Sequence, residues 1–139
     1  MARTLRGDWH VKGKLTADGM PVDIGTSIEA APTASQVLLR FAAHKPLKIK
    51  ADSSLVKALA GVAATAQTDL SLQKVLAADP AGVGTEFAVL RFAAAGKVAT
   101  LTSATETTLA VGDQLLIVAP AYADDTLAKI AVTIRALPN

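Results

Sequence analysis

The chain has 139 residues, of which 51% are hydrophobic but only 4% aromatic, and its formal net charge is +2. This length suits one domain, and so small a net charge does not by itself indicate a nucleic-acid partner. The absence of cysteine excludes disulfides, thiolate metal sites and a cysteine nucleophile. The longest apolar stretch, 115–123, is far shorter than the roughly 20 residues of a membrane span. No apolar run of signal-peptide length follows the charged N-terminus. We therefore expect neither a membrane nor a nucleic-acid partner.

The charges are distributed unevenly along the chain. Residues 1–57 hold nine Lys or Arg against five Asp or Glu, whereas residues 58–139 hold five against seven. Such polarity suits docking on charged neighbours in an assembly, and random asymmetry explains it equally well.

Runs of strand length with β-branched or alternating apolar residues recur between Gly, Pro, Asp and Asn residues. In chain order these runs are 9–15, 22–28, 37–42, 47–50, 69–75, 85–92, 98–103, 114–119 and 130–136. Ile130, Val132 and Ile134 alternate with more polar or smaller residues, which predicts a strand with one buried face. The pattern predicts an all-β, single-domain antiparallel sandwich or barrel of about eight strands.

Three features of the sequence need separate interpretation: one segment that fits two kinds of secondary structure, one loop and one repeated phrase. The apolar spacing in 54–66 fits a strand or a helix, and Gly61 with the β-branched residues after it favours the strand. An Asp-Pro pair and two glycines predict a surface loop over 76–84. The phrase Leu-Arg-Phe-Ala-Ala occurs at 39–43 and again at 90–94, which indicates either two equivalent strands of a twofold-like Greek key or a coincidence.

Residues with catalytic or metal-binding chemistry do not form a recognisable pattern. His10 and His44 are far apart, and the one acidic residue at metal-binding spacing, Asp8 two residues before His10, is a weak signal. The adjacent Asp124 and Asp125 point to opposite faces of an extended chain, so they rarely converge on one reacting atom. The sequence also lacks a Gly-x-Ser-x-Gly elbow and a phosphate-binding glycine loop. We expect no enzymatic activity, no catalytic residue, no metal and no cofactor.

Basic and aromatic residues are the best candidates for an interface. Arg40, Lys45, Lys48 and Lys50 surround Pro46, where they either protect a strand edge or contact an acidic partner. Trp9, beside Arg3 and Arg6, is either a core residue or an interface anchor. The candidate interface residues are Arg3, Arg6, Trp9, Arg40, Lys45, Lys48, Lys50 and Tyr122.

Two phrases near the C-terminus resemble a module of phage virion proteins. Residues 109–120 read LAVGDQLLIVAP and residues 125–134 read DTLAKIAVTI, whereas the module has "GD-x-L-x-I-x-AP" followed by "D-x-TLA-x-I-x-x-T". Residues 70–74 and 86–94 resemble its upstream hairpin, with 75–84 in place of a tight Asn-Gly turn. Over residues 36–136 the chain is similar to the jelly-roll cement (decoration) proteins of Bordetella short-tailed phages.

The resemblance implies a two-sheet jelly roll over residues 9–139, preceded by an arm at 1–8. It implies a structural protein made in the host cytoplasm and bound to the outer capsid surface of the virion. Its partners would be the major capsid protein and a second copy, as a homodimer or other homo-oligomer. The alternative is a tail-fibre or baseplate component with the same fold. A carbohydrate-binding sandwich is less favoured because the chain has only one Trp and one Tyr.

Overall fold

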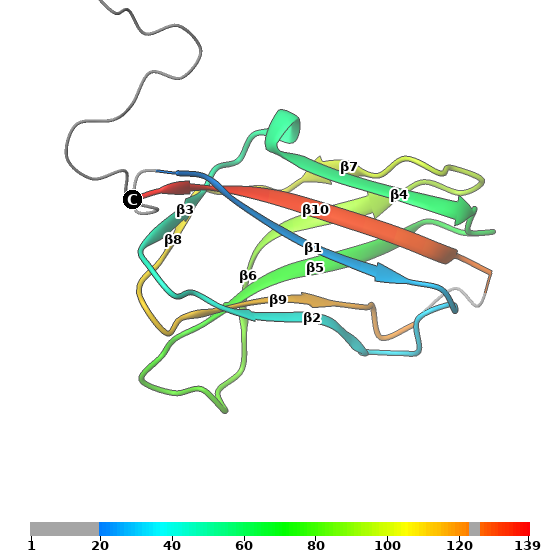
Figure 1. Cartoon of the computed structure of the whole chain (residues 1–139). Coiled ribbons are helices and arrows are strands. Elements are labelled where there is room, and N and C mark those ends of the chain that lie inside the picture. The colour runs from blue at the N-terminus through cyan, green and yellow to red at the C-terminus, as the bar shows by residue number, and fades with distance from the viewer. Residues whose placement is uncertain (1–19, 123–125) are drawn as a thin grey trace, which may run out of the picture.

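The computed structural model describes residues 20–122 and 126–139, which form two antiparallel sheets of five strands each (Figure 1). In chain order the elements are β1 (Val22–Ile28), β2 (Val37–Ala42), β3 (Leu47–Ile49), the 3₁₀ helix η2 (Ser53–Leu55), β4 (Val56–Val62), β5 (Thr68–Val75), β6 (Thr85–Phe92), β7 (Thr100–Thr102), β8 (Thr107–Leu109), β9 (Gln114–Val118) and β10 (Ala128–Pro138).

The order of the strands identifies the topology. The first sheet has the order β1-β10-β3-β8, with β4 also paired to β10, and the second has the order β2-β9-β5-β6-β7. β3 and β4 follow one another along the same side of β10, because Lys48 lies opposite Leu137 and Val56 lies opposite Ile134. They are one strand interrupted by residues 50–55. With this strand counted once, β1-β10-β3/β4-β8 facing β2-β9-β5-β6 is a jelly roll, and the predicted all-β sandwich is confirmed.

Alternation of side chains explains why these segments are strands. In β10 the buried residues Ile130, Val132 and Ile134 alternate with exposed residues, as predicted. In β4, Val56, Ala58 and Ala60 are buried, and Lys57 and Leu59 between them are exposed. A period of two residues places one face of β4 against the core, so the strand alternative for 54–66 is the correct one.

The repeated phrase Leu-Arg-Phe-Ala-Ala lies at corresponding positions of the second sheet. β2 carries the first copy and β6 the second, on either side of the central pair β9 and β5. In both copies Leu and Phe pack toward the core, but Phe92 is completely buried whereas Phe41 is only half-buried. β2 ends its sheet, whereas β6 is covered on both edges, by β5 and β7. The arrangement agrees with a twofold-like Greek key.

Some predicted boundaries differ from the structure. β7 is shorter than the predicted run 98–103, and β8 was not predicted at all. β8 forms because all three of its residues pair with β3 and Leu109 is fully buried. The predicted loop 76–84 is confirmed, since it joins β5 to β6 without a strand. The predicted strand 9–15 and the arm 1–8 lie outside the described residues.

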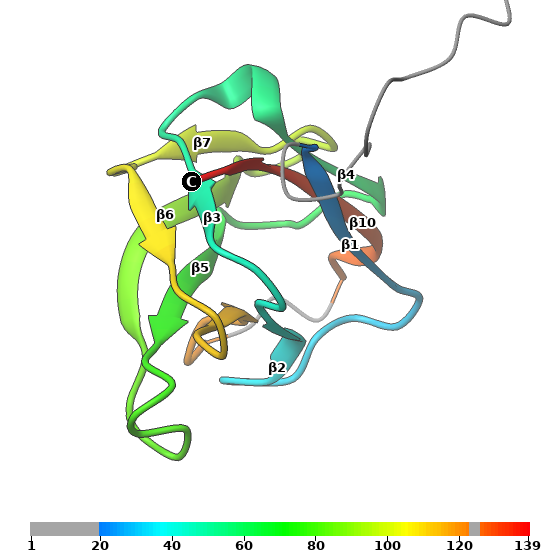
Figure 2. The same ribbon diagram turned by 60° about the vertical axis from the view of Figure 1, so that its left-hand side comes forward.

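The loops lie at two opposite ends of the sandwich. One end carries the β2–β3, β5–β6 and β8–β9 loops, together with the start of β1 and the end of β10 (Figures 1 and 2). Figure 2 shows the C-terminus beside β3, and the Asn139 amide donates to the Pro46 carbonyl oxygen at 3.4 Å. The β1–β2, β4–β5, β6–β7 and β9–β10 loops form the other end.

Candidate interaction surfaces

The three lysines of the predicted basic cluster occupy different settings. Lys45 lies in the β2–β3 loop, where its Nζ donates to the Met20 carbonyl oxygen at 3.1 Å. Lys48 points to the outer face of the first sheet, because Leu47 and Ile49 on either side of it are buried. β3 is paired on both sides, so Lys48 does not protect a free strand edge. Lys50 follows β3 and lines a surface hollow with Asp52 and Glu106.

The other described candidates lie elsewhere on the molecule. Arg40 lies on β2 in the second sheet, where its guanidinium donates to Gln114 Oε1 at 2.7 Å. Tyr122 is 95% exposed in the β9–β10 loop, at the opposite end from Lys45. The structure therefore places Arg40 on the other sheet from Lys48 and Tyr122 at the other end from Lys45, and it does not bring the candidates into one site. Arg3, Arg6 and Trp9 lie outside the described residues, as do Asp124 and Asp125.

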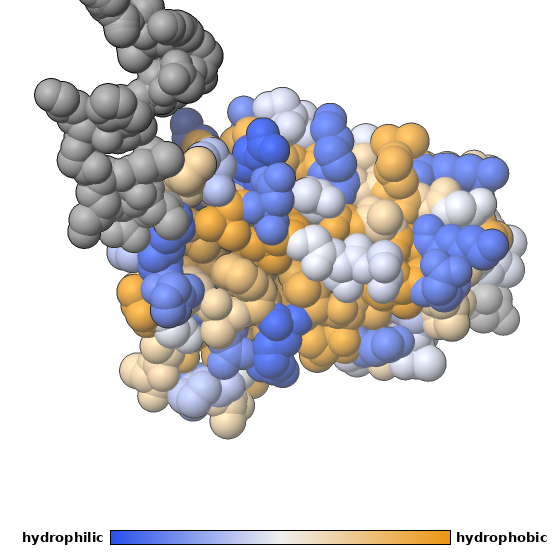
Figure 3. Space-filling model, viewed as in Figure 1, coloured by the Kyte–Doolittle hydropathy of each residue, from blue (hydrophilic) through white to orange (hydrophobic). Residues whose placement is uncertain are grey.

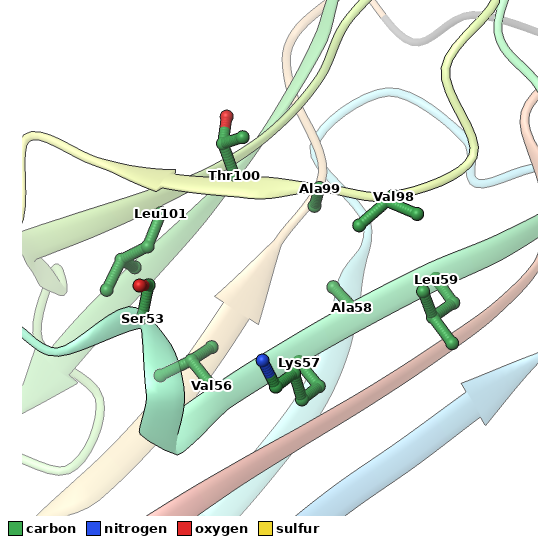
Figure 4. Close-up of a pocket in the computed structure, with 9 residues that line it drawn as sticks. All are labelled: Ser53, Val56, Lys57, Ala58, Leu59, Val98, Ala99, Thr100 and Leu101. Atoms are coloured by element: carbon green, nitrogen blue, oxygen red, sulfur yellow. The ribbon is translucent and has the colours of Figure 1, made fainter.

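A cleft opens on the first sheet at the far edge of β4. Residues 97–99 run beside β4, with the Ala60 amide donating to the Lys97 carbonyl at 2.8 Å and the Ala99 amide donating to the Ala58 carbonyl at 3.0 Å. The chain then leaves β4 and pairs with β6 as β7, in the second sheet. The divergence leaves a volume of ≈ 390 Å³ lined by Ser53, Val56, Lys57, Ala58, Leu59, Val98, Ala99, Thr100 and Leu101 (Figure 4).

The walls of this cleft can hold an apolar group but offer little chemistry. Figure 4 shows Ala99 and Leu101 pointing toward β4, whereas Thr100 points away. Of the residues that line the cleft, only Lys57 is ionisable, so a general acid and base cannot be paired there. In the described part of the chain, no three His, Asp or Glu residues are grouped so that they could hold a metal ion.

Exposed apolar side chains mark two surfaces. Leu59 and Val98 lie opposite one another across the edge of the cleft, and they are 52% and 66% exposed. Figure 3 shows a second gathering of hydrophobic side chains where β1 and β2 pass each other at the open side of the sandwich. Val22 on β1 and Leu38 and Phe41 on β2 are half-buried and pack against the core.

Asp113 has a structural role that sequence reasoning missed. Its carboxylate accepts the Ala77 amide and the Ala110 amide, each at 2.9 Å, and lies 3.7 Å from Lys74 Nζ. The Ala77 hydrogen bond above all, with help from Ala110 and Lys74, holds the pKa of Asp113 below its ordinary value against the opposing effect of burial. Gly112 precedes it at a φ of 90°, which side chains rarely adopt. The Gly112-Asp113 pair therefore joins the β5–β6 loop to the β8–β9 loop. The only feature of the sequence that could have indicated this role is the position of the pair directly before an apolar strand.

The sequence matches no protein-family model and no curated protein. No helix within residues 20–122 and 126–139 is long and apolar enough to cross a membrane. The function of the chain therefore has to be inferred from its own surfaces.

Proposed function

We propose that this chain is a non-enzymatic structural protein of a tailed phage, a cement protein that binds the outside of the capsid across joints between major capsid subunits. The observation that carries the proposal is the exposed pair Leu59 and Val98 beside an apolar cleft. Contiguous exposed apolar surface is a candidate for contact with a partner, and here the pair adjoins the cleft. The phrases that resemble virion modules support it, since 109–120 supplies the turn before β9 and β9 itself, and the second phrase runs into β10.

The protein would stabilise the capsid by thermodynamic linkage between its binding and the assembly of the shell. A protein that binds the assembled shell and not the loose subunits shifts the equilibrium toward the shell by mass action. Because one shell offers many equivalent sites, a small binding energy at each site adds up to a large stabilisation of the particle.

A second copy of the chain belongs to the proposed partners. β1 and β2 each end a sheet, so among residues 20–122 and 126–139 each has one edge without a neighbouring strand. Free strand edges of this kind are templates for pairing between chains. The apolar band between β1 and β2 lies along the same side of the sandwich (Figure 3).

Adding the protein back to particles that lack it tests the proposal. Purified protein should bind particles of the encoding phage that were assembled without it or stripped of it. The bound protein should raise the temperature at which the particles release their DNA, followed with a DNA-binding dye. Particles incubated with an unrelated β-sandwich protein are the control. An unchanged release temperature with no protein bound would contradict the proposal.

A further inference from the structure

We infer that the chain docks through the outer face of its first sheet onto an acidic protein surface that presents one protruding apolar side chain. The inference rests on the proposed function and deepens it by naming the docking face and the chemistry of the partner. It follows from the charges of the two sheets, the shape of the outer face and the position of the cleft.

The outer face of the first sheet is positively charged. Since the alternate residues of β10, β3 and β4 are buried, and those of β1 are buried or half-buried, the residues between them face outward. The ionisable residues within the strands of this outer face are Asp23, Lys48, Lys57, Lys129 and Arg135. The exposed residues Glu29, Lys50, Asp52 and Glu106 flank the ends of these strands and leave the excess of positive charge smaller but still positive. Asp23 is neutralised by Arg135, which donates two hydrogen bonds to it at 2.8 and 3.0 Å. Within the described residues none of the three lysines forms an ion pair. The pKa of Asp52, the cap of η2, is lowered first by the hydrogen bonds that it accepts from Ser54 and then by the nearby charges of Lys50 and Lys57.

The outer face of the second sheet is balanced instead. Its Arg91 pairs with Asp69, with Nε 3.0 Å from Oδ1. Glu86 accepts a hydrogen bond from the Ser71 hydroxyl at 2.6 Å, and Arg40 donates to a side-chain amide. The outer face of the second sheet therefore carries two cationic side chains and two carboxylates, and their charges cancel. Because complementary potentials guide association, an acidic surface is drawn to the first sheet and not to the second.

The shape of the first sheet also suits close approach. Its centre carries the small residues Gly25, Ser27, Ala131 and Thr133, opposite one another on β1 and β10. A backbone surface without large side chains lets a partner lie flat against it. Lys57 lines both the cleft at the edge of β4 and a smaller hollow of ≈ 200 Å³.

The cleft identifies the apolar part of the partner. Leu59 and Val98 form its rim and Val56 and Ala58 are buried in its wall. An apolar side chain seated there, next to Lys57 and its acidic counterpart, has the anatomy of an interface hot spot, with a buried apolar anchor ringed by polar contacts. The occupant of the face is therefore an acidic protein surface and not an uncharged or basic one.

Two matched pairs of variants test this inference. Lys57→Glu and Arg40→Glu make the same change of charge on exposed residues of opposite sheets. Leu59→Asp and Val37→Asp place a carboxylate at similarly exposed apolar positions of opposite sheets, 52% and 43%. In co-sedimentation with particles that lack the chain, Lys57→Glu and Leu59→Asp should each bind at least about tenfold more weakly than the wild type. Arg40→Glu and Val37→Asp should bind within about twofold of the wild type. Melting temperatures confirm that each variant folds. If Leu59→Asp does not fold, the comparison of Lys57→Glu with Arg40→Glu alone tests the docking face.

A wild-type protein that does not sediment with the particles overturns the proposed function. A wild type that sediments, with Lys57→Glu binding as well as Arg40→Glu, overturns only the docking face. Loss confined to Arg40→Glu and Val37→Asp assigns docking to the second sheet instead. Retention on immobilised polyglutamate gives a readout independent of any particle. There Lys57→Glu should elute at lower salt than Arg40→Glu, and elution at equal salt overturns the charge asymmetry of the two faces.

Discussion

Replacement of Phe92 by alanine should lower the free energy of unfolding by about 4 kcal/mol, whereas Phe41→Ala should lower it by about 2 kcal/mol. Phe92 is completely buried between the two sheets, so its removal leaves a cavity that the surrounding strands cannot fill. Phe41 occupies the corresponding position of the repeated phrase, but on an edge strand it is only half-buried. The difference between the variants therefore measures the placement of β2 and β6 and not the chemistry of phenylalanine.

Urea denaturation of the wild type and both variants gives the two costs. Phe92→Leu, which preserves most of the volume, should cost less than about 1.5 kcal/mol and remains measurable if Phe92→Ala is largely unfolded. Equal costs for Phe41→Ala and Phe92→Ala would contradict the assignment of β2 to the end of the sheet and β6 to its interior.

Asp113→Ala should destabilise the protein by about 3 kcal/mol and lower the melting temperature by about 10 °C. The substitution leaves the amides of Ala77 and Ala110 without an acceptor in a partly buried setting, and it leaves Lys74 without its ion pair. Glu106→Ala, which removes an exposed carboxylate, is the matched control and should change the melting temperature by less than about 2 °C. A fall in melting temperature no larger than that of Glu106→Ala would show that the Gly112-Asp113 turn does not depend on the Asp113 carboxylate.

The cost of Asp113→Ala should depend on pH. Because the pKa of Asp113 is lower in the folded protein than in the unfolded chain, its contribution is fully present above the unfolded value, about 4. The contribution is lost as the pH falls through the folded pKa. The gap in unfolding free energy between wild type and variant should be constant from about pH 7 to 5 and should narrow below about pH 4. Urea unfolding over this range measures the gap. A gap that widens toward acid would contradict a pKa of Asp113 that is lower in the folded protein than in the unfolded chain.

Side-chain alternation made most of the fold predictable. β1, β2 and β6 have the predicted bounds, because their apolar residues recur with strand periodicity between clear turn signals. β8 has a single large apolar residue, Leu109, so no periodicity marks it, and it exists only through pairing with β3. The sequence separates 47–50 from 54–66, but it does not show that β3 and β4 follow one another along β10, because that is defined by where the two strands pair.

The surfaces were less predictable because strand order decides which residues share a face. Lys48, Lys57 and Lys129 lie on β3, β4 and β10, and only the pairing of these strands in the first sheet brings them to one side. Arg40 is nearer to Lys48 in sequence than Lys57 is, yet it lies on the opposite sheet. The partner of Asp113 at Ala77 lies 36 residues away, which no local pattern could indicate.

Copy number in purified particles is the most direct test of the proposal that the chain is a capsid cement protein. Quantitative mass spectrometry of particles from the encoding phage, with the major capsid protein as internal standard, gives copies of this chain per shell. Repetition over the shell predicts copies on the order of hundreds per particle. Tens of copies or fewer would assign the chain to a tail fibre or baseplate, and its absence from the particle would contradict a structural role in the virion.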